Sequence, residues 1–188
     1  MRHENIFISI EGVDGVGKTT VATLLSADGA FQYHKCPSGE FAKLRGEVDV
    51  HATPLERYCF YRLASQFDSE QIRRSLCTDS VVSDRYIAST AAYHFAMDDR
   101  VRSIHDESGI LKPHFAFLLG ARSEVRTQRM AKRAIVSSDA RLEADGVLLD
   151  RVAEIFMLFD LIYIDVSDIS AMEVVTEIKR IIAQGGVT

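Results

Sequence analysis

A glycine-rich segment near the beginning of the chain combines turn-forming residues with a lysine and two threonines. Residues 12–20 read GVDGVGKTT and fit the pattern GxxxxGK[ST] at every fixed position. Glycines let the backbone curl so that successive N–H groups point toward an anion, and the start of a following helix adds positive potential. The segment therefore predicts a loop that binds the phosphates of a nucleoside triphosphate. Its residues are Gly12, Val13, Asp14, Gly15, Val16, Gly17, Lys18, Thr19 and Thr20.

Two side chains of this loop suit phosphoryl-transfer chemistry. Lys18 offers a mobile ammonium group to the terminal phosphates, and the Thr19 hydroxyl is a ligand for Mg²⁺. The pattern alone does not separate transfer of the γ-phosphoryl group to water, as in a GTPase or ATPase, from transfer to an organic acceptor, as in a kinase.

A second polar segment follows an apolar run in the middle of the chain. Residues 83–94 read SDRYIASTAAYH. Asp84 is suited to hold a Mg²⁺-bound water, and Arg85 offers a guanidinium fork to an anionic acceptor. Ser89 and Tyr93 share one face of the helix expected here. The segment predicts one wall of an acceptor pocket, although a capped helix with a polar stripe and a structural Asp–Arg pair accounts for the residue types equally well.

Short apolar runs alternate with longer segments of helical period along the chain. Strands are expected at residues 6–10, 31–34, 80–83, 114–119 and 161–165, and helices at 18–26, 54–76, 87–97, 124–133, 144–159 and 171–183. This alternation predicts an α/β fold of the three-layer P-loop NTPase type, in which a five-stranded parallel sheet has helices on both faces. Residues 35–53 and 98–113 lack clean periodicity and are expected to be connections near the ligand site.

Composition narrows the functional class. The 188 residues, 47% of them hydrophobic, are expected to form a single domain, residues 1–188, and no apolar stretch is long enough to span a bilayer. A cytoplasmic location without a membrane partner is expected. The net charge of -5 argues against nucleic-acid binding. Cys36, Cys59 and Cys77 lack CxxC spacing and the histidines lack ligand spacing, so neither disulfides nor a metal other than Mg²⁺ is expected.

The two polar segments together resemble the thymidylate kinase family of P-loop nucleoside monophosphate kinases. The family pattern EGxDGxGK[ST] is matched from Glu11 to Thr19, and DRYxxSxxAYQ is matched from Asp84 to Tyr93. A weaker similarity extends through PHFAFLLGARSEVRTQRM and the later RLE. The resemblance implies ATP with Mg²⁺ as the phosphoryl donor, a deoxynucleotide such as dTMP as the acceptor, and a homodimer.

The resemblance also implies roles for particular acceptor-side residues. In that family Asp14 would meet the 3'-hydroxyl of the acceptor and Arg85 its 5'-phosphate. Tyr93 would occupy the place of a ribose 2'-hydroxyl, which implies a deoxynucleotide.

A short lid is expected at about residues 133–143, where the sequence is polar and follows a basic segment. Family members without an arginine in the phosphate loop carry one in the lid, and Val16 leaves this loop without one. Arg133 and Arg141 are therefore the candidates to stabilise the transferring phosphoryl group. The preceding basic residues Arg122, Arg126 and Arg129 are expected on the solvated face of a helix.

Three departures from the family pattern fall on the acceptor side. The loop after the second strand usually reads Arg-Glu-Pro-Gly-Gly, whereas this chain has KCPSG from Lys35, so that a thiol replaces the acid. The arginine that touches the base in the family has no counterpart in register, and Arg62 lies two positions away. The last residue of the second motif is His94 instead of glutamine.

The sequence thus predicts direct in-line transfer of the ATP γ-phosphoryl group to a deoxynucleoside 5'-monophosphate. The catalytic candidates are Lys18, Asp14, Arg85, Arg133 and Arg141; the acceptor-binding candidates are Asp14, Tyr61, Arg62, Arg85, Ser89, Tyr93 and His94; the Mg²⁺ candidates are Thr19 and Asp84. Two alternatives remain open, a kinase for a nucleoside or a modified nucleotide and a regulator that binds nucleotide without catalysis.

Overall fold

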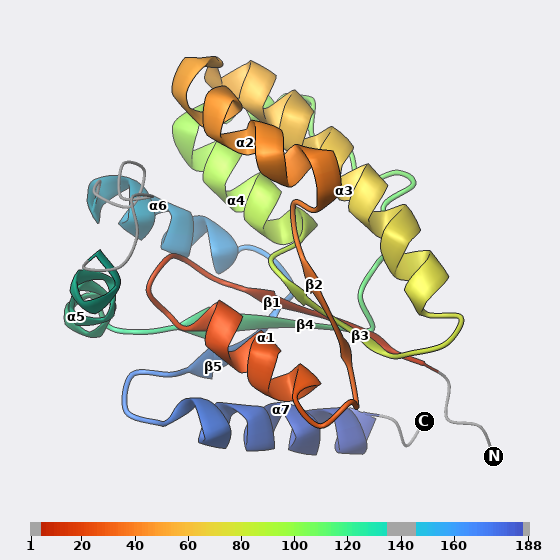
Figure 1. Ribbon diagram of the computed structural model, residues 1–188. Coiled ribbons are helices and arrows are strands. Elements are labelled where there is room, and N and C mark those ends of the chain that lie inside the picture. Colours follow the sequence, from red (N-terminus) through yellow and green to blue (C-terminus); the bar gives the residue numbers. More distant parts are fainter. Residues whose placement is uncertain (1–4, 135–145, 186–188) are drawn as a thin grey trace.

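The computed structural model describes residues 5–134 and 146–185, and a parallel sheet forms its centre (Figure 1). Within these residues five strands lie in the order β2-β3-β1-β4-β5. Their bounds are β1 Phe7–Glu11, β2 Gln32–Lys35, β3 Val81–Asp84, β4 Phe115–Gly120 and β5 Ile162–Asp165. All neighbouring strands pair in parallel, which confirms the expected sheet and brings the carboxyl ends of the strands to one edge.

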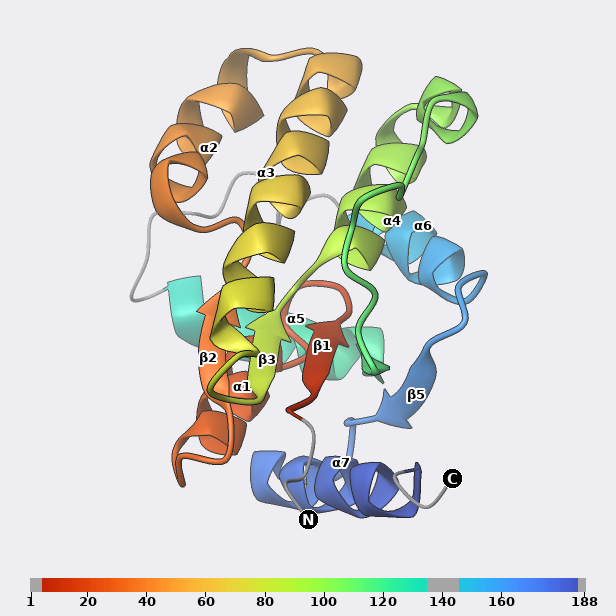
Figure 2. The same cartoon turned by 90° about the vertical axis from the view of Figure 1, so that its right-hand side faces the viewer.

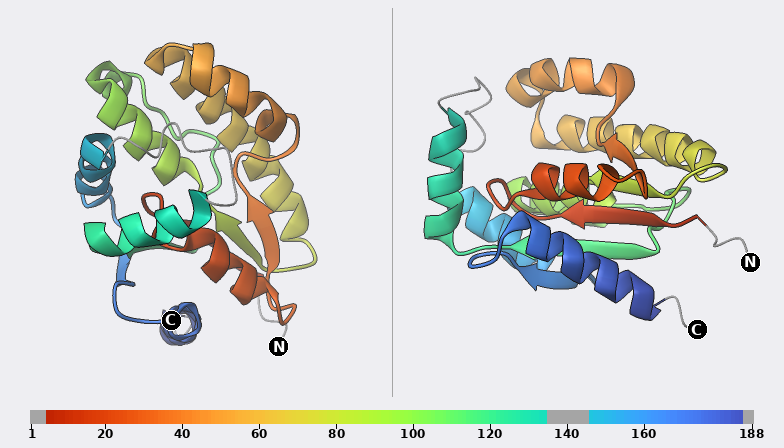
Figure 3. Two further views of the ribbon diagram at one scale, coloured as in Figure 1. Left: turned by 60° about the vertical axis from the view of Figure 1, so that its left-hand side comes forward. Right: turned by 60° about the horizontal axis from the view of Figure 1, so that its bottom comes forward.

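Helices cover both faces of the sheet. Helices α1 and α7 lie on one face, and α3, α4 and α6 lie on the other (Figure 1). Helix α5 stands across the edge where the strands end (Figure 3). The bounds are α1 Lys18–Ser26, α2 Gly39–His51, α3 Pro54–Ser75, α4 Ile87–Met97, α5 Ser123–Ala134, α6 Gly146–Phe156 and α7 Ala171–Gly185.

The central position of β1 explains where a ligand site can form. All five residues of β1 are buried, because the strand is paired on both edges and covered on both faces. Its register sets Ile10 opposite Asp84 of β3 and Glu11 opposite Leu118 of β4. The loop after β1 therefore emerges between the ends of two neighbouring strands, in the crevice where open parallel sheets bind ligands.

Helix α3 has a start signal written in the sequence. The Thr53 side chain accepts a hydrogen bond from the Glu56 backbone N–H, the Glu56 side chain accepts one from the Thr53 backbone, and Pro54 occupies the first turn. This capping box satisfies two backbone donors at the helix end. Helix α3 then runs beside α2 as a helical hairpin above the sheet (Figure 2).

The expectation that residues 35–53 form an irregular connection is wrong, because most of the segment is helix α2. None of the residues of α2 is buried. An exposed helix has no need of an apolar stripe, so the sequence lacks the period that marks a packed helix. A short 3-10 helix, η1 Asp99–Ser103, likewise lies inside the second expected connection, residues 98–113.

No helix in the described ranges is both long and apolar enough to cross a membrane.

Candidate active site

The loop between β1 and α1 adopts the conformation expected of a phosphate cradle. Gly12, Gly15 and Gly17 have φ angles of 136°, 86° and 100°, in the region that favours glycine. A Cβ atom on Gly12 would lie 2.4 Å from the carbonyl oxygen of Leu119, so no larger residue fits there. The side chains of Val13 and Val16 are buried, whereas Thr20 is exposed at the start of α1.

Lys18 lies inside this cradle with only 6% of its surface exposed. Its ammonium donates a hydrogen bond to the Val13 carbonyl at 2.7 Å and lies 3.9 Å from the Asp14 carboxylate. Burial lowers the pKa of Lys18 to about 8, and the charge of Arg85 acts in the same direction, while Asp14 opposes the shift. A cation held by one carbonyl is ready to exchange that partner for a phosphate oxygen.

Thr19 and Asp84, the candidate Mg²⁺ residues, are in direct contact. The Thr19 hydroxyl donates a hydrogen bond to the Asp84 carboxylate at 2.6 Å, and the Tyr33 hydroxyl donates to the same oxygen at 3.2 Å. Residues far apart in the chain meet here because Asp84 ends β3 beside β1. Hydroxyl and carboxylate oxygens are the ligands that Mg²⁺ prefers, usually together with waters and substrate phosphates.

Arg85 links the phosphate loop to α4. Its φ of 70° is left-handed, a conformation that costs energy for a residue with a Cβ atom. The guanidinium donates to the Gly12 carbonyl at 3.2 Å and to the Asp14 carboxylate, and it lies over the Tyr93 ring at 5.1 Å. Burial disfavours the charge, but Tyr93 and Asp14 outweigh it and raise the pKa of Arg85, so the group is a fixed cation.

Asp14 and Tyr93 complete this cluster. The Tyr93 hydroxyl donates to Asp14 at 2.8 Å. Burial alone would raise the pKa of Asp14, but the charges of Arg85 and Lys18 lower it well below its usual range. Asp14 is therefore ionised, with its carboxylate held between two cations and a phenol.

Glu11 stabilises the structure of the site. It matches the family pattern, but the sequence did not indicate a role for it. Its buried carboxylate accepts hydrogen bonds from the Ser89 hydroxyl at 2.5 Å, the Ser89 N–H at 3.2 Å and the Tyr86 N–H at 3.3 Å. These donors belong to the first turn of α4, which lacks a side-chain cap of its own. Burial raises the pKa of Glu11. Glu11 thereby fixes the start of α4, and with it Arg85, against the end of β1.

A cavity of about 720 Å³ opens beside this cluster, between the loop and helices α2, α3 and α4. It is lined by six of the seven predicted acceptor residues: Asp14, Tyr61, Arg85, Ser89, Tyr93 and His94. Arg62, the seventh, does not line the cavity. Arg62 instead donates to the carbonyls of Asp106 and Ser108. Its position on α3 directs the side chain toward the segment that contains these two residues.

Aromatic side chains of α3 and of the segment before α4 lie both inside and outside this cavity. Tyr61 lines the cavity and donates to both oxygens of Asp49 at 3.0 Å, and Tyr86 is 2% exposed and bonded to Ser69. Phe67 instead packs against Phe41, away from the lining.

His94 has a defined tautomer. Its Nδ1 lies 2.7 Å from the Thr90 carbonyl oxygen, which only accepts, so Nδ1 carries the proton. Burial lowers the pKa of His94 to about 4, and nearby Arg57 contributes, so the ring is neutral at pH 7. In the part of the chain that the structure describes, its Nε2 is a buried acceptor without a hydrogen-bond partner, and the Nε of Arg57 is a buried donor without one. Both residues line the cavity.

Sequence reasoning missed the cavity residues Arg45, Asp49 and Arg57. Arg45 and Asp49 belong to α2, which the sequence did not reveal. Arg57 lies one turn before Tyr61 on the expected helix, and that spacing was the available signal.

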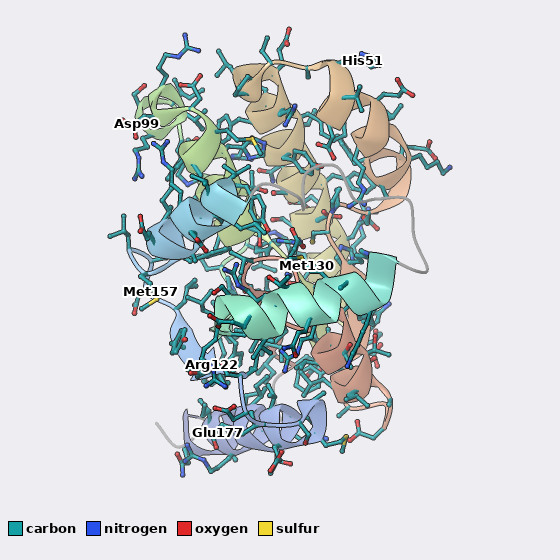
Figure 4. All side chains as sticks on the ribbon, turned by 90° about the vertical axis from the view of Figure 1, so that its left-hand side faces the viewer. His51, Asp99, Arg122, Met130, Met157 and Glu177 are labelled. Atoms are coloured by element: carbon teal, nitrogen blue, oxygen red, sulfur yellow. The ribbon has the colours of Figure 1, made fainter. Side chains whose placement is uncertain are left out.

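Of the three arginines expected on a solvated helix face, Arg122, which directly precedes α5, is exposed and pairs with Asp168. Arg126 is 7% exposed and pairs with Asp150 of α6 at 2.8 Å. Arg129 donates to the carbonyls of Val16 and Val166 at 3.2 and 2.9 Å. Figure 4 shows α5 crossing this side of the molecule, with Met130 labelled on it. Helix α5 therefore supports the phosphate loop through the hydrogen bond from Arg129 to the Val16 carbonyl.

The predicted lid, residues 133–143, falls almost wholly outside the described residues, and so does Arg141. The backbone of Arg133 belongs to the last turn of α5. Met130, one turn earlier, lies within 3.0 Å of the place that a Cβ atom on Gly15 would take.

The chain matches known proteins along most of its length. Residues 10–158 match the family model described as thymidylate kinase. The chain is 29% identical over 182 residues to a probable thymidylate kinase of Methanocaldococcus jannaschii, covering 93% of this chain and 94% of that protein. It is 30% identical over 148 residues to one of Archaeoglobus fulgidus, covering 73% and 76%. A solved thymidylate kinase from Candida albicans has the same fold, with a TM-score of 0.80 at 21% identity over 97% of this chain and 94% of that one.

Proposed function

The chain belongs to the thymidylate kinase family and is a nucleoside monophosphate kinase, and we propose that it transfers the γ-phosphoryl group of ATP to dTMP. The observation that carries the proposal is the cluster of Asp14, Arg85 and Tyr93, which touches the phosphate loop on one side and lines the cavity on the other. A hydrolase needs only water beside such a loop, whereas a cavity of this size admits an organic acceptor. No observation favours a regulator without catalysis or a kinase of another class.

The donor side fits Mg²⁺-ATP. The left-handed glycines of the loop form a backbone cradle, Lys18 is a buried cation that donates to a loop carbonyl, and the Thr19 and Asp84 oxygens lie together beside it. Bound there, Mg²⁺-ATP would supply the phosphoryl group and a metal that neutralises its charge. Lys18 would hold the terminal phosphates, and Thr19 and Asp84 would hold the metal and its waters.

Arg85 would align the 5'-phosphate of the acceptor with the donor. An acceptor phosphate is already ionised, so no strong base is needed, and catalysis rests on positioning and on charge stabilisation. The cation that follows the transferring group is proposed to be Arg133 or Arg141. Support comes from the last turns of α5, since Met130 packs against Gly15 one turn before Arg133.

Preference for a deoxynucleotide is proposed to rest on Tyr93. Its hydroxyl is fixed by Asp14, so the ring cannot turn aside to admit a further hydroxyl group on the sugar. Replacing Tyr93 with alanine should therefore reduce the ratio of kcat/KM for deoxy- over ribonucleotide acceptors by about tenfold, the value of roughly 1.4 kcal/mol in differential binding.

The base is proposed to enter the part of the cavity lined by Arg57, Tyr61 and His94. Family membership supports thymine as that base.

The test is ADP formation from Mg²⁺-ATP with dTMP, dUMP, dCMP, dAMP, the matching ribonucleotides and free thymidine as acceptors. We expect turnover with dTMP that is lost in Lys18→Ala, whose fold is checked by circular dichroism. Turnover with thymidine but not with dTMP would assign a nucleoside kinase. Absence of turnover with every acceptor, while ATP binds normally, would overturn the proposal.

The enzyme is further proposed to act as a homodimer in the cytoplasm, where nucleotide precursors are made. Support for the dimer comes from the family resemblance and from exposed apolar side chains of the α2–α3 hairpin, including Leu55 and Leu63, which are 42% and 59% exposed. Light scattering should give twice the 21.0 kDa mass of the chain. A monomer at micromolar concentration would contradict this.

A further inference from the structure

Three potential metal ligands from two separate elements meet beneath the acceptor cavity. His34 lies in β2, Cys36 follows that strand, and Asp68 lies in the middle of α3. One ligand atom from each residue, nitrogen, sulfur and oxygen, lies within 4.8 Å of the other two. The chain brings them together because the end of β2 lies beside α3, where Cys36 and Asp68 are both buried.

The surroundings of Asp68 are incomplete. Its side chain is fully buried, and the hydrogen bonds from His34 and Ser38 all go to its Oδ1 atom. Within residues 5–134 and 146–185, no hydrogen-bond partner is found for its Oδ2 atom. A buried carboxylate is costly unless its charge is compensated and its oxygens are satisfied. The only ion pair found for Asp68 among the described residues is with His34.

We propose that His34, Cys36 and Asp68 bind a divalent transition-metal ion, Zn²⁺ by the nature of the donor set. Imidazole, thiolate and carboxylate are the three kinds of side chain that bind Zn²⁺, which takes four ligands in a tetrahedron. Ligand atoms about 2.0–2.3 Å from such an ion lie roughly 3.3–3.8 Å from one another. The 3.1 Å contact between His34 Nε2 and Asp68 Oδ1 therefore needs only a small adjustment, in which the metal takes the place of the shared proton.

The outer partners and the open position also suit a metal. The Ser38 hydroxyl and N–H, which both donate to Oδ1 of Asp68, orient the carboxylate from outside the site. Cys36 and Asp68 both line the cavity, so the fourth coordination position faces it and is open to water or to a group of the acceptor.

The ion would tie the loop after β2 to α3. Helix α2 begins at Gly39, directly after this loop, and none of its residues is buried. A hairpin with so little core of its own gains more from a metal anchor at its base than a well-packed element does. The ion would thereby hold in place the wall of the cavity that carries Arg45 and Asp49.

The test uses tag-free protein, stripped with a chelator and titrated with Co²⁺ and then Zn²⁺ without nucleotide or Mg²⁺. Co²⁺ reports a thiolate ligand through charge-transfer absorption in the near ultraviolet. We expect one equivalent of Co²⁺ to produce this absorption, one equivalent of Zn²⁺ to displace it, and Zn²⁺ to raise the melting temperature. X-ray absorption should then show one sulfur at about 2.3 Å and lighter ligands at about 2.0–2.2 Å from zinc.

Matched cysteine variants locate the site. Cys36→Ser should abolish the cobalt absorption and weaken Zn²⁺ binding by more than about a hundredfold, because even the loss of an outer partner costs roughly 10–100-fold. Cys77→Ser, at an exposed thiol, should behave as the unmodified protein. Should Cys36→Ser fail to fold, His34→Asn and Asp68→Asn take its place, each judged by the Zn²⁺ affinity of folded protein.

Absence of the absorption, or a signal that Cys77→Ser removes and Cys36→Ser keeps, would overturn the proposal and leave a purely hydrogen-bonded cluster. Because none of these measurements involves turnover, their outcome is independent of the proposed kinase activity.

Discussion

The backbone of Arg85 allows a test in which two variants lose the same functional group but differ in strain. A φ of 70° costs a residue with a Cβ atom roughly 1–2 kcal/mol, whereas glycine adopts it freely. At an ordinary extended or helical position, glycine is instead less stable than alanine by about 0.5–1 kcal/mol. At a left-handed position Arg85→Gly is therefore expected to be more stable than Arg85→Ala, and at an ordinary extended or helical position it is expected to be less stable.

Both variants lose the same contacts, the hydrogen bonds to the Gly12 carbonyl and to Asp14 and the stacking on Tyr93. The difference between the variants thus reports the backbone alone. We expect Arg85→Gly to unfold with a free energy about 1 kcal/mol higher than Arg85→Ala. For a chain of this size the melting temperature should then differ by about 2–4 °C.

Activity should not distinguish the two variants, because neither has a guanidinium group for the acceptor phosphate. We expect kcat/KM to fall about 10²–10³-fold in both, the usual cost of one lost charge-stabilising donor. Arg85→Lys, which keeps the charge but not the fork, should lie between them and the unmodified enzyme. Melting curves and an ADP-coupled assay on the same preparations give both quantities.

Two results would refute this reasoning. An alanine variant as stable as the glycine variant would mean that the left-handed conformation at Arg85 is not imposed by the fold. Variants with kcat/KM within threefold of the unmodified enzyme would mean that Arg85 does not bind the acceptor.

Three further predictions concern Lys18, α5 and His94. Burial and Arg85 lower the pKa of Lys18 to about 8 in the free protein, so its ammonium is present below that pH and is lost above it. The affinity for Mg²⁺-ATP, measured by calorimetry, should therefore be constant from pH 6.5 to 7.5 and decline above pH 8. An affinity that stays constant up to pH 9.5 would contradict the lowered pKa. Arg129→Ala should raise KM for ATP and destabilise the fold by about 1–3 kcal/mol, because two carbonyls lose a charged donor. Arg122→Ala, at an exposed ion pair, should change stability by less than about 1 kcal/mol. Equal effects of the two variants would mean that Arg129 does not stabilise the phosphate loop. Burial lowers the pKa of His94 from 6.5 to about 4, so the unfolded chain binds a proton first as the pH falls. The stability that His94 contributes is therefore complete above pH 6.5 and declines between pH 6.5 and 4. His94→Gln should flatten this part of the plot of melting temperature against pH, and a similar slope in both proteins would disprove the prediction.

The donor side could be predicted from the sequence because its signals are local. The strand, the glycines, Lys18 and Thr19 occupy one continuous segment, and the motif fixes their relative positions. Asp84 was predictable from its place at the end of a strand, since parallel pairing brings neighbouring strand ends together. The bounds of α1 and α4 were predicted without error for the same reason, because both helices bury an apolar face.

The acceptor side could not be predicted to the same depth. Helix α2 buries none of its residues, so hydrophobic periodicity gave no sign of it, and Arg45 and Asp49 went unrecognised with it. Arg126 and Arg129 were misread because a basic stripe has the same composition whether it faces water or neighbouring backbone carbonyls. Only tertiary contacts distinguish the two.

The loop after β2 shows why a departure from a family pattern is a weak sign of lost function. By sequence, Cys36 replaces an acid, and a carboxylate is missing from the acceptor side. In the fold, Asp68 of α3 brings a buried carboxylate to this same loop, where Ser38 and His34 bind it. The site therefore keeps a carboxyl group at that place, but this group comes from another element and lies beside a thiol and an imidazole. The distance between the phosphate loop and Arg85, on which phosphoryl transfer depends, is set elsewhere, by the pairing of β1 with β3.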